Sequence, residues 1–320
     1  MSNDWLDTVV VARYHATARI VVLDLVSRDG VALPEFAAGA HVDVLVDDAA
    51  GLVRQYSLCG PPHDRTRYRL AVLAETASRG GSLGMHRLRA GDGLRISRPR
   101  NRFGVSDRAR RHLLVAGGIG VTPLLAMAHS LQVAGADYRL HYCARSHADA
   151  AFLDELEHDP RVRLHLDDGP DEQRFSIASD LGPPDPDTAV YVCGPGGFMD
   201  FVISAAQGAG WPAEAIHKER FAPVENAGAR LADGTFTVRL ARTGGAYEVK
   251  ESESVLDVLL AQGVDAPYSC RQGICGECIV RVLAGEPDHR DDILTDRERA
   301  EGLFTTCSSR AHSPLLELDL

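Results

Sequence analysis

The first 108 residues alternate apolar and polar positions in short segments that are separated by turn residues. The turns include Arg28-Asp29-Gly30 and Pro61-Pro62. An alternation with a period of two residues is typical of strands that bury one face. We therefore expect a small antiparallel β-barrel in residues 1–108, with strands over residues 7–13, 18–27, 41–45, 51–58, 67–72 and 93–96.

The pattern changes in residues 109–222, where apolar strands alternate with helical segments. A continuous apolar run over residues 112–116 leads through a glycine-rich turn into a helix at residues 124–133. Thr122 is the expected N-cap of this helix and Pro123 its first residue. Further strands are expected at residues 138–144, 162–166, 189–193 and 215–218. This order predicts a parallel, doubly wound α/β domain, with its ligand at the carboxyl ends of the strands.

The rest of the chain begins with a polar stretch that contains Pro and Gly, residues 223–231, and this stretch is typical of a linker. A third domain is expected over residues 232–320. Its helix, residues 255–262, has Ser254 and Asp257 in the positions of a capping box and Gly263 in the position of a C-cap. Its strands are expected at residues 235–240, 247–250, 279–282 and 315–320.

Four cysteines in this third domain have the spacing of metal ligands. Cys270, Cys275 and Cys278 form a C-x4-C-x2-C motif, and Cys307 follows much later in the chain. This spacing is typical of a plant-type 2Fe–2S cluster, in which four thiolates hold two irons. The sequence therefore predicts a carrier of single electrons.

Two glycines inside the motif, Gly273 and Gly276, allow the sharp turns that three ligands on one short loop require. A zinc site would more often show two C-x2-C pairs, and the third interpretation is a set of incidental buried cysteines. The ligands and the glycines together favour the cluster. This domain resembles the C-terminal β-grasp ferredoxin domain of the phthalate dioxygenase reductase group.

Two stretches of the expected barrel carry groups that a flavin requires. On a strand, the sequence R-x-Y-S-L places Arg54, Tyr56 and Leu58 on one face and Ser57 on the other. The sequence R-G-G-S opens a helix, where free amides and the helix dipole favour a phosphate. Each stretch alone could be a surface pair or a plain turn. Together they resemble the flavin site of the ferredoxin reductase superfamily.

The resemblance implies that the flavin is FMN, because R-G-G-S resembles the FMN-phosphate loop of the phthalate dioxygenase reductase group. Family members often carry basic residues before this loop, where the present chain has Val72-Leu73-Ala74-Glu75, so a contact from that position is not expected. The residues implied to contact the flavin are Arg54, Tyr56, Ser57, Leu58, Arg79, Gly80, Gly81 and Ser82.

Three loops at strand ends in the second domain are candidates for nucleotide binding. Their sequences are G-G-I-G-V-T-P, A-R-S and C-G-P-G-G, and the first alone could be an ordinary tight turn. Together they resemble the pyridine-nucleotide domain of the same superfamily. The resemblance implies that Gly118, Ile119, Gly120 and Thr122 meet the pyrophosphate, that Arg145 and Ser146 meet the adenosine ribose, and that Cys193, Gly194 and Pro195 meet the nicotinamide.

Cys193 and Ser57 are the two residues expected at the reacting centre. A polarizable thiol beside the nicotinamide can shape the path of a hydride without forming a covalent bond, although a small buried residue is the alternative interpretation of Cys193. The resemblance also places Phe221 near the flavin at a domain junction, and a core residue at the domain boundary is the alternative.

Composition and charge restrict the partners and the compartment. The net charge of −11 lacks the basic excess of a nucleic-acid-binding protein, and no apolar run approaches the roughly 20 residues of a membrane span. The N-terminus lacks the pattern of a signal peptide, and Cys59, Cys143 and Cys193 are scattered as in a reducing compartment. We expect a cytoplasmic protein with no nucleic-acid or membrane partner, and a monomer.

The resemblance extends over nearly the whole chain, in the order flavin, nucleotide, ferredoxin. This order is similar to that of the phthalate dioxygenase reductase group, which includes the reductase components of vanillate-type O-demethylases. It implies electron transfer from NADH through FMN and the 2Fe–2S cluster to a Rieske-type aromatic oxygenase, since the chain has no Rieske motif of its own. A haem or diiron monooxygenase as acceptor, or a non-enzymatic redox sensor, are the alternatives.

Overall fold

The structure, a computed structural model, describes residues 5–320 apart from residues 77, 79 and 224–233. These residues form two compact units, which divide between Glu219 and Arg220. Each unit is described by itself. Except for Pro223, the predicted linker lies outside the described residues, as does Arg79. No helix in the described ranges is both long enough and apolar enough to cross a membrane.

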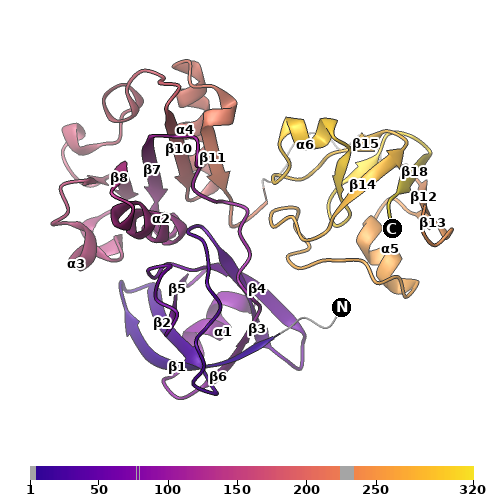
Figure 1. Ribbon diagram of the computed structural model, residues 1–320, viewed down its shortest axis with the longest axis horizontal. Coiled ribbons are helices and arrows are strands. Elements are labelled where there is room, and N and C mark those ends of the chain that lie inside the picture. Colours follow the sequence, from indigo (N-terminus) through magenta and orange to yellow (C-terminus); the bar gives the residue numbers. More distant parts are fainter. Residues whose placement is uncertain (1–4, 77, 79, 224–233) are drawn as a thin grey trace. The chain divides into compact units, whose positions relative to one another are not determined.

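The first unit begins with a six-stranded antiparallel sheet in the order β4-β3-β6-β1-β2-β5 (Figure 1). A bridge between Leu58 and Leu70 joins the two outer strands, so the sheet closes into a barrel. The short helix α1 (Gly81–Arg87) follows β5. The strands are β1 (Leu6–His15), β2 (Ile20–Ser27), β3 (His41–Asp47), β4 (Leu52–Ser57), β5 (Tyr68–Leu73) and β6 (Gly93–Ile96).

Alternate residues of these strands fill the barrel, as the apolar–polar alternation predicts. Val42 and Val44 on β3 are fully buried with Leu23 of β2 and Leu70 of β5 in one apolar core. The predicted antiparallel barrel is therefore confirmed.

The same unit continues with a five-stranded parallel sheet in the order β11-β10-β7-β8-β9. Helix α2 (Val121–Val133) packs on one face with Leu114 and Tyr191, and α4 (Gly196–Gly208) packs on the other with Val115. The predicted doubly wound sheet is confirmed. Its strands are β7 (Arg111–Gly117), β8 (Asp137–Ala144), β9 (Val162–Leu166), β10 (Thr188–Cys193) and β11 (Ile216–Glu219), and the short helix α3 spans Leu153–Leu156.

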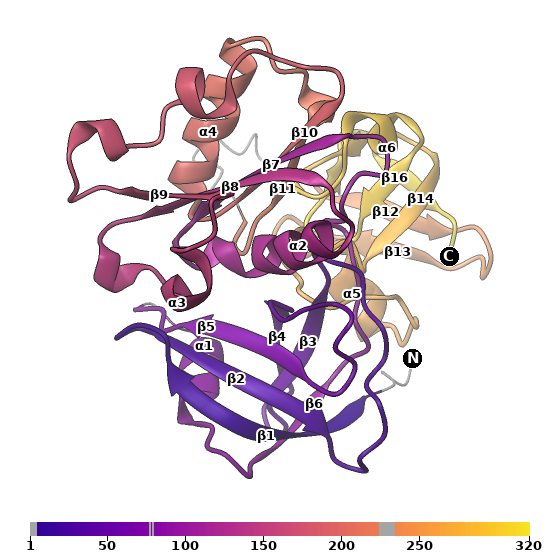
Figure 2. The ribbon, with the colours of Figure 1, turned by 60° about the vertical axis from the view of Figure 1, so that its left-hand side comes forward.

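Helix α2 lies between the parallel sheet and the barrel (Figure 2). Its buried Leu124 and Leu125 belong to a core that also contains Ile20 and Val22 of β2 and Ala71 of β5. One continuous apolar core thus connects the barrel with the parallel sheet. This connection brings the ends of barrel strands close to the carboxyl ends of the parallel strands.

The start of α2 differs from the prediction. The helix begins at Val121 after a 3-10 turn over Gly118–Gly120, so Gly120 occupies the N-cap position and Thr122 lies within the first turn. The prediction of Thr122 as N-cap is therefore wrong. Its hydroxyl donates to the carbonyl of Ile119 at 2.9 Å instead, because the glycines already turn the chain into helical geometry.

The second unit contains a mixed sheet in the order β13-β12-β18-β14-β16 and a small β15-β17 pair. Ser254 caps α5 (Val255–Ala261) by accepting from the Asp257 amide, and Gly263 has a φ of 75° just after the helix, as predicted. The other elements are β12 (Phe236–Leu240), β13 (Ala246–Val249), β14 (Ile279–Ala284), β15 (Pro287–Asp288), α6 (Asp296–Ala300), β16 (Leu303–Thr305), β17 (Arg310–Ala311) and β18 (Leu315–Leu318).

Candidate functional site

The four cysteines of the predicted cluster come together in the second unit. Cys270, Cys275 and Cys278 lie on the loop between α5 and β14, and Cys307 follows β16. The Sγ atoms of Cys278 and Cys307 are 3.2 Å apart. Cys275 and Cys278 are buried, and the other two are half-buried. The fold thus closes a gap of 29 residues in sequence to assemble one sulfur site.

Backbone amides around the loop point at these sulfurs. The N–H of Gln272 donates to Sγ of Cys270 at 3.3 Å, and the N–H of Gly273 donates to Sγ of Cys307 at 3.3 Å. Gly273 and Gly276 have φ values of 72° and 79°, and a Cβ on Gly273 would lie 2.5 Å from Oγ of Ser308. Donors aimed at sulfur suit a site whose thiolates carry negative charge, so these residues fit a 2Fe–2S cluster.

The candidate flavin residues of β4 meet the start of α1. A Cβ on Gly81 would lie 2.6 Å from Cγ of Arg54, and one on Gly80 would lie 3.3 Å from Cδ2 of Leu52. Gly80 also has a φ of 91°, a conformation that side-chain-bearing residues rarely adopt. The absence of side chains here therefore lets the loop lie directly against the Arg54 stem. The R-x-Y-S-L strand and the R-G-G-S loop, which the sequence analysis treats as one site, are therefore in contact in the structure.

The other predicted flavin residues have different environments. Tyr56 packs against the barrel core, and burial raises the pKa of its phenol. Leu58 is fully buried in that core, and its N–H donates to the carbonyl of Ala40. The hydroxyl of Ser82 accepts from the Glu75 amide at 3.1 Å and donates to Oγ of Ser78. Contacts of these residues with a flavin stay predictions.

The loops after β7 and β10 meet at the carboxyl edge of the parallel sheet. A Cβ on Gly120 would lie 2.3 Å from the carbonyl oxygen of Cys193 and 2.5 Å from the amide nitrogen of Gly194. A Cβ on Gly194 would lie 3.0 Å from Cα of Gly117. Glycine thus permits backbone to pack on backbone, and the structure brings the predicted pyrophosphate and nicotinamide loops together.

The remaining nucleotide candidates lie around the same edge. Ile119 is in the 3-10 turn before α2, and Pro195 is the N-cap residue of α4. Arg145 is exposed just after β8, and the hydroxyl of Ser146 donates to Asp149 at 2.7 Å. The positions agree with a ligand at the carboxyl ends of the strands, and the individual contacts stay predictions.

Ser57 and Cys193 converge on a carboxylic acid that the sequence analysis did not single out. The Ser57 hydroxyl donates to Oε2 of Glu219 at 3.2 Å, and Glu219 is aligned with Cys193 between β11 and β10. Burial raises the pKa of Glu219 to about 8. Burial, followed by the Glu219 charge, raises the pKa of the Cys193 thiol. The group that can exchange a proton near neutral pH is therefore Glu219, whereas Cys193 stays a thiol.

Phe221 belongs to the second unit and is 41% exposed. Its predicted place beside a flavin stays a prediction, as does its alternative role at a domain boundary.

Comparisons with known families divide the chain in a similar way. The family described as "2Fe-2S iron-sulfur cluster binding domain" matches residues 238–312, which include the three cysteines of the loop and Cys307. The family described as "Dimethylamine monooxygenase subunit DmmA-like, N-terminal domain" matches residues 95–216, which contain β7 to β10.

Similar proteins cover the whole chain. A vanillate O-demethylase oxidoreductase of Pseudomonas sp. (strain HR199 / DSM 7063) is 46% identical over 98% of this chain and 100% of its own length. The solved structure of a phthalate dioxygenase reductase is 38% identical, with a TM-score of 0.71 over 99% of this chain and 98% of that chain. An intact type IV self-sufficient cytochrome P450 monooxygenase is 39% identical, with a TM-score of 0.86 over 99% of this chain, which spans 41% of that chain.

Proposed function

Because this chain belongs to the phthalate dioxygenase reductase family of oxygenase reductases, we propose that it passes electrons from NADH through FMN and a 2Fe–2S cluster to a Rieske-type aromatic oxygenase or O-demethylase. The observation that carries the proposal is the full-length match to an O-demethylase oxidoreductase in a chain that holds the four-cysteine site. When bound, FMN accepts a hydride and releases single electrons, and the cluster carries each electron onward.

The residues of the first unit would bind and orient the two organic molecules. Arg54, which lies against Gly81, would offer a positive charge to a flavin phosphate. The contact between Gly120 and Cys193 holds two loops at the edge where a nucleotide would bind. This arrangement supports hydride transfer between two bound rings, for which orientation matters most.

Ser57 and Glu219 would bind and donate the proton that accompanies electron transfer. With a pKa of about 8, the Glu219 carboxyl is largely protonated at neutral pH and can release its proton to a nearby base. The Ser57 hydroxyl, 3.2 Å away, fixes the orientation of Oε2. In this role Glu219 carries the proton, and Ser57 orients the Glu219 carboxyl. The neighbouring Cys193 thiol stays uncharged.

The proposal has four finer parts. The flavin is FMN rather than FAD, the nucleotide is NADH rather than NADPH, and the protein is a monomer in the cytoplasm. The R-G-G-S loop would bind one terminal phosphate, and Arg145 and His147 are the cations that NADPH would require for its 2′-phosphate. Chromatography of heat-released flavin would test the first part, and predominance of FAD would contradict it. Equal kcat/KM for NADH and NADPH would contradict the second.

A haem monooxygenase is the second candidate acceptor. The observation in its favour is the match of 99% of this chain to part of a self-sufficient cytochrome P450 monooxygenase. The deciding experiment mixes the NADH-reduced protein anaerobically with a Rieske-type O-demethylase and, separately, with a haem monooxygenase. Faster reduction of the Rieske protein supports the first proposal, and faster reduction of the haem protein supports the second. Failure of NADH to reduce the chain would contradict both.

A further inference from the structure

Strands β3 and β4 carry two polar pairs on the face opposite Val42 and Tyr56. The register of the two strands places His41 opposite Ser57 and Asp43 opposite Gln55. His41, Asp43 and Ser57 are only 5%, 1% and 6% exposed. Burial of so many polar groups is stable only when they satisfy one another's hydrogen bonds. The pairs therefore form a connected network, and its protons have defined positions.

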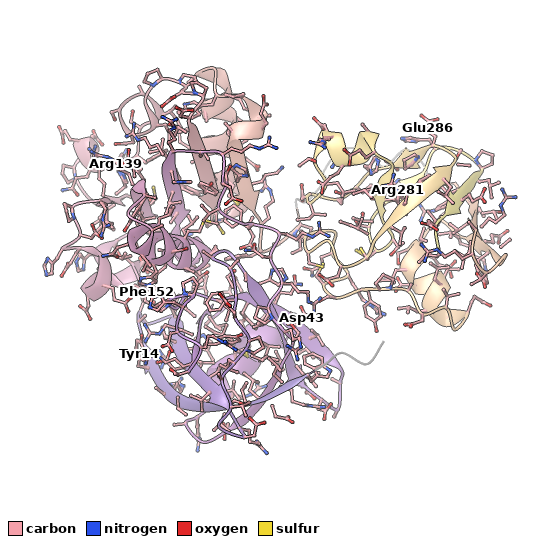
Figure 3. The ribbon with its side chains drawn as sticks, viewed as in Figure 1. Tyr14, Asp43, Arg139, Phe152, Arg281 and Glu286 are labelled. Atoms are coloured by element: carbon pink, nitrogen blue, oxygen red, sulfur yellow. The ribbon has the colours of Figure 1, made fainter. Side chains whose placement is uncertain are left out.

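Asp43 fixes the orientation of the Gln55 amide. Arg100 donates to Oδ2 of Asp43 and forms an ion pair with it. A carboxylate only accepts hydrogen bonds, so the Gln55 atom 3.1 Å from Oδ1 must be the amide nitrogen. Asp43 lies on the barrel strand β3, where it is labelled in Figure 3.

The Gln55 amide in turn fixes the tautomer of His41. The same amide nitrogen lies 3.4 Å from Nε2 of His41. Because this nitrogen only donates, Nε2 of His41 must accept, and the ring proton must sit on Nδ1. Nδ1 lies 4.0 Å from Oε1 of Glu219, whose other oxygen accepts from Ser57. The neutral ring thus carries its N–H group on the nitrogen that lies 4.0 Å from Glu219.

We propose that His41 is a positioning residue for Glu219, locked by Asp43 and Gln55 as the neutral Nδ1–H tautomer, and that this lock keeps a cation away from the Glu219 carboxyl. Its functional meaning rests on the proposed role of Glu219 as the proton-holding group. A second proton on His41 would place an N–H donor against the Gln55 amide donor. The network therefore disfavours the imidazolium, and a neutral neighbour lets Glu219 keep its proton near neutral pH.

Within the described part of the first unit, the groups of other strands that interact with Glu219 lie on β3, β4 and β10. They are the Ser57 hydroxyl on β4, the His41 ring on β3 and the Cys193 thiol on β10. None of them is a cation when His41 is neutral. The charge of His41 is consequently the variable that can shift the Glu219 equilibrium, and it can be changed without altering Glu219 or Ser57.

The first test reads the tautomer directly. Nitrogen-15 NMR of histidine-labelled holoprotein in the oxidised state should show His41 protonated at Nδ1 only, with its signals assigned by loss in His41→Gln. Two other histidines, the half-buried His86 and the buried His165, provide internal references. Nε2 of His86 faces the Val72 carbonyl and must carry a proton, and Nδ1 of His165 faces the Gln173 carbonyl and must carry one. A proton on Nε2 of His41, or an imidazolium at neutral pH, would overturn the proposal.

The second test compares two variants that should shift the pKa of Glu219 in opposite directions. Gln55→Met keeps the side-chain length but removes the amide, so His41 can accept a second proton and the Glu219 pKa should fall by about one unit. His41→Phe removes the Nδ1–H dipole, so the Glu219 pKa should rise. The measurement is carbon-13 NMR of glutamate-labelled protein over pH, assigned with Glu219→Gln.

The control for this titration is His86→Gln, a substitution of a half-buried barrel histidine outside the network, which should leave the Glu219 titration unchanged. A loss of packing alone would not produce shifts of opposite sign in the two test variants. Equal shifts, or none, would refute the role of His41. Both NMR tests are made without turnover, whereas the proposed function is tested by reduction with NADH, so either can fail alone.

Discussion

Gly120 and Cys193 approach so closely that a Cβ on Gly120 would lie 2.3 Å from the Cys193 carbonyl oxygen. The obstructing atoms belong to the backbone, which cannot rotate away as a side chain can. This contact holds the loop after β7 against the loop after β10. The spacing of the proposed nucleotide site therefore depends on the absence of one methyl group.

Gly120→Ala should weaken NADH binding, because the two loops must separate to admit the methyl group. We expect the KM for NADH to rise at least about tenfold and the Tm to fall, since overpacking costs roughly 1–3 kcal/mol. Steady-state kinetics and thermal unfolding measure both. Gly208→Ala at the end of α4 is the matched control, because its Cβ would meet nothing within 4 Å. An unchanged KM in Gly120→Ala would argue against this edge as the binding site.

Cys278→Ser should separate the two halves of the electron path. The substitution damages the sulfur site in the second unit but leaves the first unit chemically complete. NADH-dependent reduction of ferricyanide should therefore survive, while reduction of the oxygenase should collapse. Cys59→Ser, a buried cysteine of the barrel, should keep its iron and both activities. Near-normal oxygenase reduction by a Cys278→Ser protein without iron would rule out the route through the cluster.

The pH dependence of flavin reduction should report Glu219. Burial raises its pKa from 4.5 to about 8, so the carboxyl loses its proton as the pH rises through about 8. The rate of reduction by NADH should change with an inflection near that pH, measured by stopped-flow absorbance. Glu219→Gln should remove the inflection. If the variant retains it, another group controls the profile.

The folded first unit should lose stability in mild acid because of two buried histidines. Nδ1 of His141 lies 3.0 Å from Nε2 of His165, and both rings are almost fully buried. Burial lowers the pKa of His141 to about 4 and also lowers that of His165. Between about pH 4 and 6.5 the unfolded chain binds more protons than the folded one, so stability falls as the pH falls through this window.

The contribution of His141 alone is on the order of 3 kcal/mol, because its pKa falls from 6.5 to about 4, a difference of about 2.5. Denaturant unfolding of the flavin-loaded protein, followed by flavin fluorescence at several pH values, would measure the loss. His141→Phe should flatten this dependence, whatever its stability at neutral pH. The same slope in both proteins would assign the acid sensitivity to other groups.

Electron delivery to the oxygenase should slow as salt rises. Residues 223–320 contain 10 Lys and Arg and 17 Asp and Glu, a net charge of −7. A complex that forms and dissociates for each electron benefits from charge steering, and exposed charges are screened beyond about 8 Å at physiological ionic strength. Stopped-flow reduction of the oxygenase at low and high salt would test this. A rate independent of salt would favour apolar docking around the cluster loop, for example through Ile274.

The three folding patterns and a sulfur site at the C-x4-C-x2-C loop could be predicted from the sequence because their signals are local. The run over residues 162–166 and the spacing of Cys270, Cys275 and Cys278 each occupy a few consecutive positions. The start of α2 was mispredicted at Thr122, since the preceding glycines adopt a 3-10 turn that no capping rule anticipates. A local sequence pattern therefore predicts that a helix is present more accurately than it predicts the residue at which the helix begins.

Glu219 could not be found from the sequence because its chemistry depends on distant residues. In H-K-E-R-F it is one acidic residue among charged neighbours, and Ser57, its hydrogen-bond partner, lies 162 positions away. Only the packing of β4 against β11 buries the carboxyl and changes its acidity. The barrel, the parallel sheet, Ser57 and Cys193 were each predictable, but the carboxylate that joins them at the meeting of the two sheets was not.

The left-handed turns at Gly273 and Gly276 have a consequence for redox energetics. Together with the left-handed residue Arg271, they shape a loop whose N–H groups at Gln272 and Gly273 donate to cysteine sulfur. An electron added to the site makes these sulfurs more negative and strengthens the same bonds, so the loop conformation raises the reduction potential. The reduction potential of this site is consequently determined in part by the backbone conformation of the loop, and not by the identity of the four ligands alone.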